Sequence, residues 1–80
     1  MPADTPPQLS PDQLRVLVLL AEGHSHQSIA RRINASLPAV RMRLSRAYQV
    51  LGARNGPHAV AIAYRAGLLP APNQKRAHQQ

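Results

Sequence analysis

The spacing of apolar residues is helical throughout residues 9–69, without the alternation that predicts strands. The clearest case is "SLPAVRMRLSRAYQVLG", residues 36–52. Its apolar residues, Val40, Leu44, Ala47 and Leu51, have the 4-3-4 spacing of a buried helical stripe. No internal repeat interrupts this pattern. The sequence therefore predicts one small all-α domain with a four-helix, bundle-like arrangement.

Capping residues set the limits of the first two expected helices. Ser10 is a good N-cap with Gln13 completing a capping box, and Gly23 is a natural stop. A second, shorter helix follows Ser25 and ends near Ile33, where Asn34 is a plausible left-handed terminator. The residues expected to face the core are Val16, Leu17, Leu20, Ile29, Ala30 and Ile33.

Proline and glycine set the limits of the other two helices. The third is capped by Ser36 or Leu37, carries a proline in its first turn, and ends at Gly52. The fourth starts after Asn55 and runs to about Gly67. Residues 1–8 and 70–80 are proline-broken and lack periodicity, so we expect flexible tails on both sides of a 9–69 domain.

The charge balance predicts a negatively charged partner. Ten Lys and Arg against three Asp and Glu give a net charge of +7 over 80 residues, which favours nucleic acid or an acidic membrane surface. The chain has no cysteine, the longest apolar run is "VLVLLA", and the N-terminus does not resemble a secretory signal. We therefore expect a soluble cytoplasmic protein without disulfides.

The third helix carries the residues expected to meet that partner. No acidic residue follows Gly23, so the arginines of this helix have no local carboxylate; the simpler alternative is a solvated basic face. The short "NAS" segment before it predicts a helix-turn-helix, whose second helix fits the major groove of DNA. Arg41 is then the strongest candidate base reader, because arginine binds guanine bidentately. The arginines better placed for phosphates are Arg31, Arg32, Arg43, Arg46 and Arg54.

Residues 9–69 resemble the LuxR/GerE-type helix-turn-helix domain. The matching positions are Leu9-Ser10, Val16-Leu17, Leu20-Ala21-Glu22-Gly23, Ile29-Ala30, Ser36, Val40-Arg41, Leu51-Gly52, Asn55 and Ala59-Val60. Several polar positions of the family pattern differ, and Gly56 stands in place of an arginine. The resemblance implies base contacts from Arg41, Met42 and Ser45, with Pro38 beside them, and double-stranded DNA as the partner. Because the chain starts eight residues before the first helix, it resembles the stand-alone members that have no input domain.

Two apolar surfaces predict protein contacts. "AVAIAYRA" in the fourth helix is apolar almost all round, and the resemblance implies dimers that pair there. The residues expected in this dimer interface are Ala59, Ile62, Ala63 and Ala66. On the first helix, Leu14 and Val18 lie on a different face from the core residues, which predicts either ordinary exposed aliphatics or a site for a partner protein.

The residue content also bears on functions other than DNA binding. With three carboxylates, no glycine-rich phosphate loop, and only His24 and His26 as a closely spaced pair, we expect no enzyme, metal site, cofactor or small-molecule ligand. One alternative is the promoter-binding region 4 of a sigma factor. The segment "AVRMRLSRAYQVL" resembles the recognition helix of that region. Another is a protein-interaction module that binds and modulates a different regulator.

Overall fold

The structure is a computed structural model that describes residues 8–69. These residues form four helices, α1 (Pro11–Ala21), α2 (His26–Ile33), α3 (Leu37–Leu51) and α4 (Gly56–Arg65), and contain no strand. The predicted all-α, four-helix fold is confirmed. Apart from Gln8, the tails predicted for residues 1–8 and 70–80 lie outside the described part of the chain.

All four helices begin at a side-chain cap. The Ser10 N–H donates to Gln13 Oε1 at 3.0 Å and the Gln13 N–H donates to Ser10 Oγ at 3.1 Å, which is the predicted capping box. The oxygens that cap the other helices are Ser25 Oγ, Ser36 Oγ and Asn55 Oδ1, which accept from the N–H groups of Ser28, Ala39 and His58. Each cap satisfies a backbone donor that the helix itself leaves free.

Left-handed residues end the helices close to the predicted positions. After α1 ends at Ala21, Gly23 has φ +97°, and Gly52 after α3 has φ +71°. Helix α4 ends at Arg65, two residues earlier than expected. There Gly67 takes φ +76°, so that the Leu68 N–H can donate to the Ala63 carbonyl at 2.8 Å.

Asn34 is the one described non-glycine residue with a positive φ, at 58°. This conformation lets the Ala35 N–H donate to the Ala30 carbonyl at 2.9 Å and turns the chain from α2 toward α3. We expect Asn34→Ala to lower the free energy of unfolding by about 1 kcal/mol, because the left-handed region is costly for a residue with an ordinary Cβ. Asn34→Gly should be neutral or stabilising. Urea denaturation of both variants tests this, and equal losses would contradict it.

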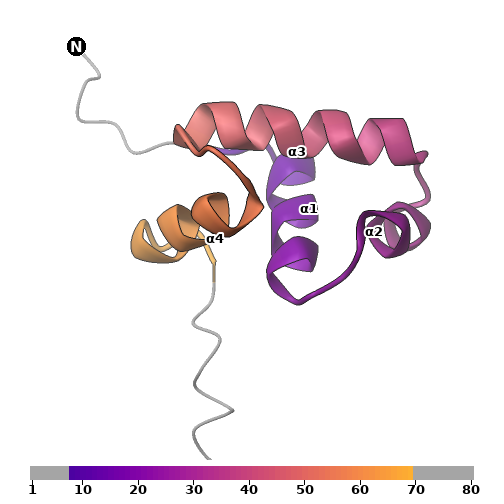
Figure 1. Cartoon of the computed structure of the whole chain (residues 1–80), viewed down its shortest axis with the longest axis horizontal. Coiled ribbons are helices and arrows are strands. Elements are labelled where there is room, and N and C mark those ends of the chain that lie inside the picture. Colours follow the sequence, from indigo (N-terminus) through magenta and orange to yellow (C-terminus); the bar gives the residue numbers. More distant parts are fainter. Residues whose placement is uncertain (1–7, 70–80) are drawn as a thin grey trace, which may run out of the picture.

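Helix α1 lies at the centre of the domain, with α2 and α4 on opposite sides of it and α3 running across all of them (Figure 1). Two adjacent residues of α1, Val16 and Leu17, are both fully buried, and each belongs to a different core cluster. The first core cluster joins α1, α2 and α3 through Val16, Ile29, Ala30, Val40 and Leu44. The second core cluster joins α1, α3 and α4 through Leu17, Leu51, Ala59, Ala63 and Leu69.

The predicted buried stripe of α3 is confirmed. Val40, Leu44, Ala47 and Leu51 are all buried and face the core along the length of the helix. Of the other predicted core residues, Leu20 and Ile33 are half-buried and pack at the edge of the first core cluster.

The predicted dimer interface on α4 needs a correction. Ala59 and Ala63 are 0% exposed and belong to the second core cluster, so they cannot meet another copy of the chain. Ile62 is half-buried against the same cluster, and Ala66 is exposed. The prediction was wrong for the two alanines because an all-round apolar helix gives no indication of which face turns inward.

The separate outer face predicted on α1 is also corrected. Leu14 and Val18 are half-buried and pack against the second core cluster. Because α1 serves two clusters, it needs a wider apolar arc than a helix that packs on one side. Packing within the domain therefore accounts for both residues.

No helix within residues 8–69 is both long and apolar enough to cross a membrane.

Candidate nucleic-acid interface

The outward face of α3 carries a second stripe with the same spacing as the buried one. Pro38, Met42, Ser45 and Gln49 follow the 4-3-4 rule, two positions out of step with the core stripe, and all four are exposed. A shift of two residues turns a side chain by about 200° around a helix, so this surface stripe lies opposite the core. Its side chains are free to meet a partner along the whole helix.

Arginines border the surface stripe on both sides. Arg41 and Arg46 are exposed, and helical geometry places them on opposite flanks of the stripe. Arg43 is half-buried at the margin between the surface stripe and the core. The face thus combines an uncharged centre with positive edges. This arrangement suits a groove with bases at its floor and phosphates on its walls.

Further arginines lie near the two ends of α3. Arg31 and Arg32 are exposed in the last turn of α2, just before the three-residue turn Asn34–Ser36 that leads into α3. Arg54 is exposed in the loop after its C-terminal end. The structure therefore places all five predicted phosphate-contacting arginines on α2, α3 or the loop that follows α3.

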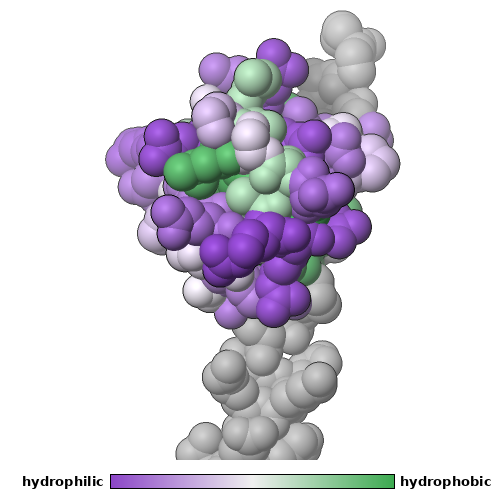
Figure 2. Space-filling view, turned by 90° about the vertical axis from the view of Figure 1, so that its right-hand side faces the viewer, coloured by the Kyte–Doolittle hydropathy of each residue, from purple (hydrophilic) through white to green (hydrophobic). Residues whose placement is uncertain are grey.

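No carboxylate neutralises these arginines within residues 8–69. The acidic residues there are Asp12 in α1 and Glu22 at its C-cap, and no arginine forms an ion pair with either. Glu22 instead lies 3.8 Å from His24, measured from Oε1 to Nε2. The side of the molecule that carries α2 is covered mostly by hydrophilic residues (Figure 2). The positive charge remains available to an anionic partner.

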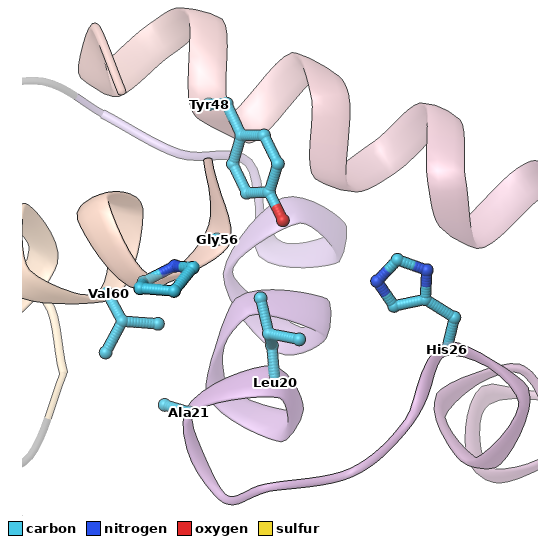
Figure 3. Close-up of a pocket in the computed structure, with 7 residues that line it drawn as sticks. Leu20, Ala21, His26, Tyr48, Gly56 and Val60 are labelled. Atoms are coloured by element: carbon cyan, nitrogen blue, oxygen red, sulfur yellow. The ribbon is translucent and has the colours of Figure 1, made fainter. Parts of the chain in front are cut away.

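The fold also contains a groove that the sequence did not reveal. It has a volume of about 590 Å³ and opens between the ends of α1 and α3 and the starts of α2 and α4. The lining residues are Leu20, Ala21, His26, Tyr48, Gly56, Pro57 and Val60. The Tyr48 hydroxyl points into it from α3, with His26 across the opening and Leu20 below (Figure 3). Burial raises the pKa of Tyr48, so the hydroxyl is neutral at physiological pH.

Gly56 makes room for this tyrosine. A Cβ at position 56 would lie 3.1 Å from the Tyr48 hydroxyl oxygen and 3.1 Å from Leu20 Cδ2. Gly56, which departs from the LuxR/GerE pattern, therefore leaves the space that the Tyr48 side chain occupies. Neither residue signals a groove in the sequence, because the groove arises where four helix ends come together. The groove lies off the surface stripe of α3, on the flank that carries Arg41 two turns before Tyr48.

Two helices joined by a three-residue turn, of which the second presents an exposed face bordered by arginines, define a helix-turn-helix DNA-binding domain. Residues 7–51 match the family described as sigma-70, region 4, and the chain belongs to this family. No curated protein matches the chain. The predicted helix-turn-helix and its role in DNA binding and transcription are supported by this match, and the family is not an enzymatic one. The match ends with α3, leaving α4 outside it, and does not test the LuxR/GerE-type resemblance.

Proposed function

We propose that this domain binds double-stranded DNA sequence-selectively to regulate transcription, with α3 lying in the major groove. The observation that carries the proposal is the surface stripe of α3, uncharged at its centre and flanked by Arg41 and Arg46 without carboxylate partners. The major groove is about 12 Å wide and admits one α-helix with its side chains. In this arrangement Pro38, Arg41, Met42 and Ser45, on the first turns of α3, reach base edges.

The remaining arginines would hold the domain on the duplex. In this arrangement the arginines before and after α3, with Arg43 and Arg46 on its flanks, would meet phosphates on both strands. Such contacts fix the orientation of the recognition helix but carry little sequence information. The proposal requires no metal or cofactor, and it places the activity on DNA in the cytoplasm.

The test is to select bound sequences from random duplex DNA and compare two variants on the preferred site. Arg41→Ala should weaken binding by about 1–3 kcal/mol and relax the preference at one base position, because a bidentate guanine contact is lost. Arg46→Ala should weaken preferred and unrelated duplexes alike, because a phosphate contact is lost. Gel shifts on both duplexes separate these effects. Wild-type affinity of both variants on the selected site would overturn the proposal.

A second candidate function follows from the family match itself, namely promoter binding as region 4 of a sigma factor. A sigma region acts together with RNA polymerase, whereas a regulator of the LuxR/GerE type binds its operator without it. Selection with and without added polymerase distinguishes them. A sequence enriched by the domain alone at physiological salt supports the regulator, and one enriched only with polymerase supports the sigma function.

We also propose that two copies pair through α4, although fewer residues are available for this contact than the sequence predicted. Of the predicted set, Ala66 is exposed and Ile62 is half-buried, so these two residues remain for the pairing. Two copies related by a two-fold axis bind half-sites about one helical turn apart. Enrichment of a palindrome with that spacing supports the pairing, and enrichment of a single half-site argues against it.

A further inference from the structure

Met42 is an exposed apolar residue that belongs to neither core cluster. It is 52% exposed, and Val50 is the other large apolar side chain that the structure exposes within residues 8–69. A single exposed aliphatic is ordinary by itself. Met42, however, belongs to the surface stripe of α3, next to Pro38 one turn earlier, whereas Val50 lies off the stripe near the end of the helix.

The chemistry of the stripe limits which bases it can distinguish. In the major groove cytosine presents a donor, adenine a donor and an acceptor, guanine two acceptors, and thymine an acceptor with a methyl group. The exposed residues in the first two turns of α3, Pro38, Arg41 and Met42, include no carboxylate and no amide. Ser45, one turn later, has a hydroxyl that can both donate and accept, so it does not select one base. Arg41 supplies donors for guanine, and Met42 supplies an apolar surface that fits only the thymine methyl.

From these observations we infer that Met42 is a specificity-determining residue that contacts the C5-methyl group of a thymine, next to the guanine bound by Arg41. The inference rests on the proposed function, because it requires α3 to lie in the major groove. Residues 41 and 42 differ by about 1.5 Å along the helix axis, against about 3.4 Å between stacked bases, so the two bases are at most a step or two apart.

Uracil substitution tests the contact, because uracil differs from thymine only by the missing methyl group. The probe is a duplex enriched from random DNA by the full chain, with each thymine replaced by uracil in turn. One replacement should weaken binding about three- to fivefold, the effect of leaving one methyl group without its apolar contact. With Met42→Ala that difference should disappear, and with Met42→Leu it should persist.

Two controls isolate the contact from general effects. Val50→Ala removes the other exposed apolar side chain of α3 and should leave the uracil effect unchanged. Circular dichroism checks that each variant keeps its helices, which is expected because both positions are exposed and alanine is a strong helix former.

The outcomes separate this inference from the proposed function. If no uracil replacement weakens wild-type binding, or if the weakening persists in Met42→Ala, the thymine contact is wrong while selective binding stands. If random DNA yields no preferred sequence, the proposed function fails and the thymine contact fails with it.

Discussion

Ala63→Glu is expected to unfold this domain. Ala63 is 0% exposed in the second core cluster, against Leu17 of α1 and Leu51 of α3. The described residues place no basic side chain in that cluster, so a glutamate there would be overpacked and without a partner for its charge. An unpaired buried charge costs about 3–5 kcal/mol, and a domain of this size has a total stability of about the same magnitude. Thermal unfolding followed by circular dichroism should show loss of the cooperative transition.

The matched control is Ala61→Glu on the same helix. Ala61 is exposed, and Arg65 follows it by four residues, so a glutamate there lies in water near a favourable partner. Its free energy of unfolding should stay within about 0.5 kcal/mol of the wild type. A folded Ala63→Glu protein with a melting temperature like that of Ala61→Glu would show that Ala63 is not in the core. It would also restore the dimer interface that the sequence alone predicted on this residue.

Local signals in the sequence were sufficient for the helices. Caps such as Ser10 and Asn55 and the left-handed Asn34 act within one turn of chain, so they can be identified without knowing the fold. The buried stripe of α3 could be predicted for a similar reason. Its 4-3-4 apolar stripe occupies one arc and its arginines all lie outside that arc, which leaves a single way to turn the helix.

The same argument explains where the sequence was insufficient. In α4 the run "AVAIAYRA" has apolar residues at nearly every angle, so periodicity does not choose a face. The structure turns Ala59 and Ala63 inward, where small side chains allow α4 to pack closely on α1 and α3. The groove at Tyr48 was also beyond sequence reasoning, because its walls come from all four helices. The exposed side of α3 was accessible to prediction because its own pattern defines it.

The arginines around α3 predict a steep dependence of DNA affinity on salt. Each phosphate contact releases condensed counterions, and the slope of log affinity against log salt is about −0.9 per contact. Arg31, Arg32, Arg43, Arg46 and Arg54 would together give a slope between roughly −4 and −5. Raising the salt from about 50 mM to about 200 mM should then weaken binding on the order of 500-fold. Fluorescence anisotropy with a labelled duplex across this range measures the slope.

Single alanine substitutions show which arginines produce that slope. Arg32→Ala or Arg54→Ala should make it shallower by about 0.9, because one phosphate contact is lost. Arg15→Ala and Arg65→Ala remove the same charge from exposed positions on α1 and α4, outside the helix-turn-helix and the loop that follows it. These two controls should lower affinity slightly through the net charge while the slope stays as in the wild type. If all four substitutions reduced the slope equally, binding would depend on the overall charge of the domain. The proposal that α3 and the residues around it contact the duplex would then be contradicted.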